Sequence, residues 1–214
     1  MKIATIAAVV ALFAAGTASA SPVNLITNGN FETVATGYTF NSGFKVINSG
    51  SSALTGWTVG ASSVDLIRNA YNAIDGYSVD MLGTPGPGFL SQSFNVVAGQ
   101  RYNLSFDMAR NSGGPAGQGV AVSFGGVVGN FYSTAAASNT LYSSNTLSFT
   151  AATTGLATLS FASAAKAGTP LDTFSGAVID NVSVMTAVPE PETYAMLLAG
   201  LGLMGFLRRR KAAK

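Results

Sequence analysis

The chain contains no cysteine and no histidine among its 214 residues. Without cysteine it forms neither disulfides nor thiolate metal sites, so an exported domain of this composition must depend on its hydrophobic core. Without histidine it lacks the commonest general base and the commonest transition-metal ligand. It also lacks a G-x-S-x-G motif and a zinc motif, and no pair of carboxylates stands out as a glycosidase pair. These absences predict a protein that is not an enzyme.

Charged residues are scarce, at 9% of the chain, and they are unevenly placed. The net charge of the whole chain is +2, but Lys2 and the five cations of residues 208–214 lie at its ends. Residues 21–187 hold five cations and seven carboxylates, which gives 5 − 7 = −2. The high isoelectric point therefore belongs to the C-terminal end. No basic patch with interleaved aromatic residues remains, so nucleic-acid binding has no support.

The first 20 residues have the pattern of a secretory signal peptide. Lys2 is the charged n-region, residues 3–15 are the apolar h-region, and Ala18-Ser19-Ala20 is a small-residue cleavage site. The alternative is a retained N-terminal membrane helix, for which the apolar run is short. We expect cleavage after Ala20 and an exported mature chain.

The C-terminal residues 188–214 have three parts in a fixed order. Two prolines keep the first part, Pro189-Glu190-Pro191, extended. An apolar run over 194–207 follows, about 21 Å long as a helix and therefore short for a bilayer core of about 30 Å. Next comes a cationic cluster that favours the cytoplasmic side. This cluster contains Arg208, Arg209, Arg210 and Lys211.

This order of segments closely resembles the PEP-CTERM sorting signal of Gram-negative bacteria. The resemblance implies that exosortase, a membrane cysteine transpeptidase-like enzyme, recognises the Pro-Glu-Pro motif and releases the protein. The short membrane helix would then be a transient anchor in the inner membrane. The final location would be the cell surface or the extracellular space. The alternative is a simple C-terminal tail anchor.

Residues 21–187 are long enough for one domain with a full core. Short alternating runs separated by turn residues dominate, which is the pattern of an all-β sandwich or barrel. In the clearest run, Tyr102, Leu104 and Phe106 face one way and the intervening polar residues the other. We therefore predict about ten strands in two packed sheets. The predicted runs are 23–26, 44–47, 56–59, 63–67, 77–82, 89–96, 102–108, 120–124 with 127–128, 140–150, 155–163 and 177–184.

Seven of the segments together carry a second resemblance. They resemble the choice-of-anchor C family of exported bacterial proteins and the related plant cell-wall proteins of the galactose-binding-like jelly roll. The resemblance implies a β-sandwich similar to carbohydrate-binding modules, without established catalytic activity. The segments are 24–32, 56–59, 64–67, 75–81, 90–94, 102–106 and 179–184.

The family pattern implies a ligand face near Trp57, the single tryptophan of the chain. Sugars are bound by aromatic faces and by planar polar side chains. In the alternative interpretation Trp57 belongs to the core, and Asp65 and Arg68 simply pair with each other. The implied ligand residues are Trp57, Asp65, Arg68, Asn69, Tyr71 and Gln92, with Tyr38, Tyr77 and Arg110 as weaker additions.

The resemblance also implies a structural calcium ion where the first and last strands meet. Glu32 and Asp180 occupy the matching positions, and backbone carbonyls near Gly29, Asn30 and the loop 50–52 could complete the ligand set. Ca²⁺ takes six to eight oxygen ligands in a tolerant geometry. In the alternative interpretation Glu32 and Asp180 are edge carboxylates hydrogen-bonded to turn amides.

These features lead to one functional hypothesis and one alternative. The hypothesis is an exported protein, processed by exosortase, whose domain binds polysaccharide without catalysis. The alternative is a structural component of a biofilm or extracellular polymer matrix that acts by self-association and has no discrete sugar site.

Overall fold

The computed structural model of the protein describes residues 23–36, 40, 43–133, 142–187, 197–202 and 204. Eleven strands form among these residues, and every paired neighbour within a sheet is antiparallel. The strands are β1 (Phe44–Asn48), β2 (Thr58–Ala61), β3 (Ser63–Arg68), β4 (Tyr77–Asp80), β5 (Gly88–Val96), β6 (Arg101–Arg110), β7 (Gln118–Phe124), β8 (Val127–Tyr132), β9 (Tyr142–Thr150), β10 (Gly155–Ala165) and β11 (Ala177–Thr186).

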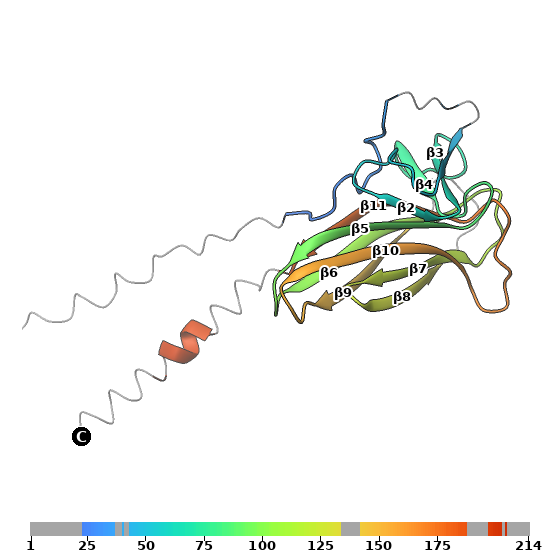
Figure 1. Cartoon of the computed structure of the whole chain (residues 1–214). Coiled ribbons are helices and arrows are strands. Elements are labelled where there is room, and N and C mark those ends of the chain that lie inside the picture. Colours follow the sequence, from blue (N-terminus) through green and yellow to red (C-terminus); the bar gives the residue numbers. More distant parts are fainter. Residues whose placement is uncertain are drawn as a thin grey trace, which may run out of the picture.

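The strands form two sheets that pack face to face. The six-stranded sheet has the order β1-β3-β4-β11-β6-β9, and the five-stranded sheet has the order β2-β5-β10-β7-β8. Figure 1 shows β5, β10, β7 and β8 in front, with β6 and β9 of the other sheet behind them. The predicted all-β sandwich is therefore confirmed. Most predicted strands fall within two or three residues of the observed bounds.

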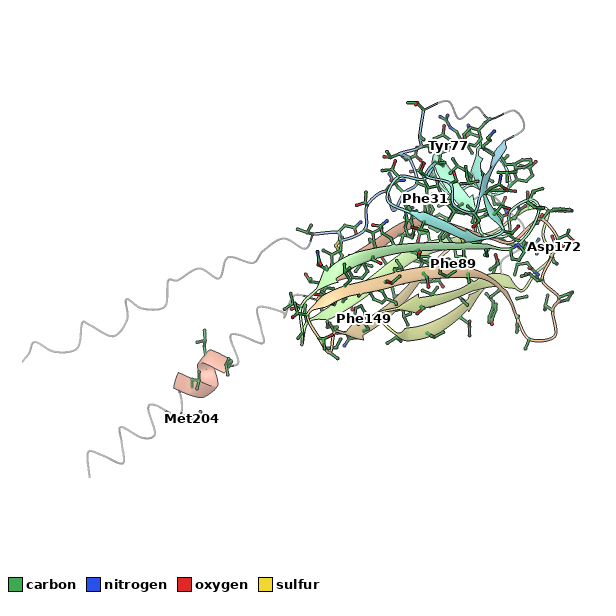
Figure 2. All side chains as sticks on the ribbon, in the orientation of Figure 1. Phe31, Tyr77, Phe89, Phe149, Asp172 and Met204 are labelled. Atoms are coloured by element: carbon green, nitrogen blue, oxygen red, sulfur yellow. The ribbon has the colours of Figure 1, made fainter. Side chains whose placement is uncertain are left out.

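Alternating side chains place the core between the sheets. Along β6, Tyr102, Leu104 and Phe106 are buried, whereas Asn103 and Arg101 are exposed. Aromatic rings then link the two layers: Phe106 meets Phe161 of β10 edge to face at 5.1 Å between centroids. Figure 2 shows Phe149, another core ring, at the opposite end of the sandwich from Asp172.

The first described residues run along the last strand. We predicted residues 23–26 as the first strand, and this is a correction: they have no strand conformation. Single hydrogen bonds hold them instead, from Leu25 N to the Val184 carbonyl at 2.9 Å and from Val182 N to the Gly29 carbonyl at 2.9 Å. The two ends of the domain thus meet, as the sequence predicted, without a regular ladder.

The targeting segments lie largely outside the described residues. This applies to the signal peptide 1–20 and to Pro189, Glu190, Pro191, Arg208, Arg209 and Arg210. Residues 197–202 and 204 are helical. Within the part of the chain that the structure describes, no helix is both long and apolar enough to cross a membrane.

Candidate functional site

A cavity of about 310 Å³ lies on the outer face of the six-stranded sheet. Alternation along β3 creates this face, because Val64 and Leu66 enter the main core while Asp65 and Ile67 point the other way. The volume falls within the range of small-molecule sites. The cavity is lined by Phe44, Asp65, Ile67, Tyr71, Asp80, Thr84, Asn111, Phe174 and Ser175.

Asp65 of β3 is one of the two carboxylates at this cavity, and only 5% of its surface is exposed. Its Oδ1 accepts a hydrogen bond from the Thr84 amide and its Oδ2 one from the Thr84 hydroxyl, both at 3.1 Å. Burial raises the pKa of Asp65, and the two bonds from Thr84 oppose that rise. Thr84 therefore orients the carboxylate and leaves further lone pairs on both oxygens.

Asp80 of β4 lies directly opposite Asp65 in the β3–β4 register and is 1% exposed. Its Oδ1 accepts from the amides of Leu82 and Gly176, at 2.9 and 3.0 Å, and its Oδ2 accepts from Asn111 Nδ2 at 2.6 Å. Burial raises the pKa of Asp80 to about 7, against the lowering effect of these bonds. The carboxyl group thus joins β4 to the loops that begin at Asn111 and end at Gly176.

Three aromatic rings form the sides of the cavity. Phe44 of β1 and Tyr71 meet edge to face, with centroids 5.7 Å apart, and Phe174 is 53% exposed. Tyr71 has a φ of +55°, which is unusual for a bulky residue. Asn72 holds this segment by donating from Nδ2 to the Arg110 carbonyl at 2.6 Å. The backbone is thus kept in a conformation that places the Tyr71 ring beside Phe44.

Trp57 does not take part in this cavity, which corrects the predicted ligand face. It is 4% exposed, and its Nε1 donates to the Asn28 carbonyl at 2.9 Å. Its ring lies in the main core, 5.5 Å from that of Phe31 and 6.3 Å from that of Phe161. The alternative interpretation, a core tryptophan, is what the structure shows.

The other predicted ligand residues separate into two groups. Asp65 and Tyr71 come together at the cavity. Arg68 instead lies over the Tyr77 ring, with its guanidinium carbon 4.9 Å from the ring centroid. The alternative interpretation, in which Arg68 pairs with Asp65, is therefore wrong, since Asp65 accepts its hydrogen bonds from Thr84. Gln92 is engaged with the first residues of the domain, because it both accepts from and donates to the backbone of Thr27. Asn69 is exposed beside the cavity segment, and Tyr38 lies outside the described residues.

Glu32 and Asp180 converge on the turn between Asp75 and Ser78. Glu32 Oε1 accepts from the Tyr77 amide, and Asp180 accepts from the Asn181 amide and the Ser78 hydroxyl. Burial raises the pKa of Asp180 to about 7, and the nearby Glu32 charge adds to the rise. The two carboxylates therefore accept hydrogen bonds from backbone amides of this edge. This is the arrangement that the alternative interpretation, without calcium, predicted.

This edge fits a calcium site poorly. No group of three or more acidic, histidine or cysteine side chains that could hold a metal occurs among the described residues. Three of the four oxygens of Glu32 and Asp180 already accept hydrogen bonds, whereas Ca²⁺ needs six to eight oxygens. Calcium with Asn30, Glu32 and Asp180 as ligands stays a prediction. It requires a higher Tm when Ca²⁺ is restored after EDTA, and an unchanged Tm would refute it.

Sequence reasoning missed most of the cavity. Asp80 alternates with buried residues in a predicted strand, which was the one available signal that it shares a face with its neighbours across the sheet. Asn111, Phe174 and Ser175 come from loops that are distant in sequence from β3 and β4. Nothing local in the sequence indicates that these loops meet.

Two family profiles match the chain. The profile described as "Protein of unknown function (DUF642)" matches residues 24–185, and the PEP-CTERM protein-sorting motif matches residues 187–211. The sorting motif marks an exported protein that exosortase processes. Neither profile supports the more specific resemblance to the choice-of-anchor C family, which stays a prediction.

Relatives of known structure or sequence are distant. Halomucin of Haloquadratum walsbyi is 32% identical over 93 residues, which is 42% of this chain, and the match spans 1% of halomucin's own length. A Stig cyclase of Fischerella sp. TAU, solved with an indole ligand, is 17% identical with a TM-score of 0.52 over 79% of this chain and all of that one. TmCBM61, solved with beta-1,4-galactotriose, is 17% identical over 77% of this chain and 99% of that one, with a TM-score of 0.47. The cyclase shares the fold alone.

Proposed function

From the premise that the chain belongs to the DUF642 family and carries a PEP-CTERM sorting motif, we propose that it is an exported, non-catalytic polysaccharide-binding protein. After release by exosortase, it would act at the cell surface or in the extracellular polymer matrix. The observation that carries the proposal is the cavity on the six-stranded sheet, which combines aromatic sides with oriented polar groups. Aromatic faces and a few placed polar groups are the chemistry that binds sugars.

The carboxylates of the cavity support binding more than catalysis. A glycosidase needs one carboxyl group free to give a proton and a second free to act as base or nucleophile. Both oxygens of Asp80 accept hydrogen bonds from the protein, and both oxygens of Asp65 accept from Thr84. We therefore expect no hydrolysis of chromogenic glycosides. Turnover that disappears in Asp65→Asn would refute this part of the proposal.

A glycan array probed with the full chain tests the proposal. Selective binding to a class of polysaccharides, reduced at least tenfold in Tyr71→Ala, is the expected result, because the variant removes one aromatic side of the cavity. Phe89→Ala is the matched control. It removes an aromatic ring from the five-stranded sheet, where Phe89 contacts Gly60 and lies next to the buried Leu90. Binding lost equally in both variants, or no binding by the parent protein, would contradict the proposal.

Self-association as a matrix component is a second candidate, and the two outer strands favour it. β8 and β9 end their sheets and contain no charged residue, and within the described residues no further strand pairs with their outer edges. Natural proteins usually protect such edges with charge or proline. Concentration-dependent assembly without glycan binding, weakened by Thr146→Lys in β9, would favour this candidate. A monomer at all concentrations would exclude it.

A further inference from the structure

The cavity contains two buried carboxylates and no cation among its lining residues. Asp65 and Asp80 are cross-strand partners, and like charges in such positions destabilise a sheet. Each is almost inaccessible to water, so solvent screens their repulsion poorly. The charge of Asp65 is one of the causes that raise the pKa of Asp80. A positively charged ligand in the cavity would therefore reduce the repulsion between the two carboxylates.

The sides of the cavity suit the same kind of ligand. A cation above the face of an aromatic ring is attracted by the ring quadrupole, and the effect grows when the site excludes water. Phe44, Tyr71 and Phe174 provide three such rings around the carboxylates. Phe44 and Tyr71 are in edge-to-face contact, with their ring planes at 84° to each other. The two rings therefore form adjacent sides of the cavity.

Two further acidic residues lie on the same face of the six-stranded sheet outside the cavity, and a third lies in the loop next to Phe174. Asp107 and Asp180 are paired in the β6–β11 register, and Asp180 points away from the main core, as Asp80 does. Asp172, which accepts from the Ser175 amide, lies beside the wall formed by Phe174. Arg68 is turned toward the Tyr77 ring and hydroxyl. An acidic face of this kind raises the association rate of a polycation.

A bare metal ion is a poorer match than an organic cation. Ca²⁺ and Mg²⁺ require an oxygen-rich shell, whereas three of the nine lining residues are aromatic and one is isoleucine. The described residues also contain no cluster of metal-ligating side chains. A sugar that carries an ammonium group matches both the carboxylates and the aromatic rings of the cavity. Its charge can interact with the carboxylates while the sugar ring stacks on the aromatic side chains.

Building on the proposed polysaccharide binding, we propose that this cavity selects a sugar unit with a free ammonium group, as in a polysaccharide of partly de-N-acetylated amino sugars. Asp65 is the principal contact, since each of its oxygens has accepted one bond and retains a lone pair for the ammonium. Asp80, its cross-strand partner at the cavity, contributes negative charge in its ionised form. Tyr71 and Phe44 stack on the sugar and on the cationic edge.

The test compares oligosaccharides of equal length by isothermal titration calorimetry with the full chain. The probes are a glucosamine hexasaccharide, its fully N-acetylated form, a neutral galactan oligosaccharide and an oligogalacturonate, at about pH 6.5. We expect the glucosamine form to bind at least tenfold more tightly than the acetylated form. The preference should persist, reduced in size, at about 0.5 M salt, because buried charges are screened less than exposed ones.

Asp65→Asn should reduce the preference to twofold or less, with a melting curve that shows a folded protein. Asp107→Asn is the matched control, since Asp107 lies on the same sheet outside the cavity and should leave the preference unchanged. If Asp65→Asn does not fold, Tyr71→Leu replaces it, with a loss of at least fivefold in affinity for the glucosamine form.

The outcomes separate this inference from the proposed function. Equal binding of the acetylated and glucosamine forms, or tighter binding of a neutral or anionic oligosaccharide, overturns the ammonium preference and leaves polysaccharide binding standing. Binding of none of the four probes, together with an empty glycan array, overturns both. An equal loss of preference in Asp107→Asn and Asp65→Asn would mean attraction by the acidic face as a whole, and would overturn the cavity assignment.

Discussion

At the scale of single residues, Trp57 is a core residue whose indole N–H group makes a hydrogen bond to the backbone. Its indole N–H donates to the Asn28 carbonyl, and its ring lies between those of Phe31 and Phe161. Buried tryptophans usually find such a partner for the N–H group. The residue thus fixes the N-terminal segment of the domain onto the sandwich, and its role is stability.

The first prediction is that Trp57→Phe lowers the free energy of unfolding by about 1–3 kcal/mol, because it removes buried area and one of the two hydrogen bonds that the Asn28 carbonyl accepts. Glycan affinity should not change. Urea denaturation and the calorimetric assay measure the two quantities. Leu156→Ala, at a residue that is 75% exposed, is the control and should shift stability by less than about 0.5 kcal/mol. If Trp57→Phe lost glycan binding while its free energy of unfolding stayed unchanged, Trp57 would have to be a ligand-binding residue.

At the scale of elements, the turn before β4 depends on close approach of Glu32. Gly76 has a φ of +47°, and a Cβ atom there would overlap the Glu32 carboxylate, which accepts from the Tyr77 amide. The turn also brings the Asp75 amide and the Ser78 hydroxyl to Asp180. One glycine thus allows the N-terminal segment, the turn and β11 to share a hydrogen-bonded edge.

We therefore expect Gly76→Ala to destabilise the domain more than Gly99→Ala, by about 1 kcal/mol or more. Gly99 is the matched control because it has a φ of +79° and nothing within 4 Å of a Cβ position, so its substitution adds backbone strain alone. Chemical denaturation of the two variants gives the difference. Equal losses would show that Glu32 moves aside freely and that the shared edge contributes little.

At the scale of the whole molecule, the buried carboxyl groups connect stability to pH. The pKa of Asp80 is raised by burial to about 7 in the folded state, from the ordinary aspartate value of 3.8 that an unfolded chain would approach. The pKa of Asp180 is raised in the same direction. Between these pH values the folded state binds more protons than the unfolded state, so the free energy of unfolding falls as pH rises.

The third prediction is a higher Tm at pH 5 than at pH 8. The contribution of Asp80 is fully present below about pH 4 and is lost as the pH rises through about 7, with a slope on the order of 1 kcal/mol per pH unit. Differential scanning calorimetry across this range measures it. Asp80→Asn should make the fall in stability with pH shallower without abolishing it, because Asp180 keeps its own raised pKa. A Tm that rises from pH 5 to pH 8 would contradict the burial of neutral Asp80.

The sequence by itself determined the C-terminal sorting signal and the fold class. Order and composition identify the sorting motif of residues 187–211, and period-two alternation identifies the strands of a sandwich, because both are encoded over short stretches of chain. The resemblance to the jelly-roll family placed Asp65 and Tyr71 among the predicted ligand residues, and both line the cavity. It did not separate them from Trp57 or Gln92, which lie elsewhere, and their role in ligand binding stays a prediction.

Only the tertiary structure decided which side chains meet. Whether Trp57 faces the core or a ligand depends on how the two sheets stack, and a strand pattern does not specify that. The cavity joins Phe44, Asp65 and Asp80 from the sheet to Asn111 and Phe174 from loops far along the chain. Such contacts arise from strand order and loop closure, which are long-range properties, so no local pattern of residues carries them.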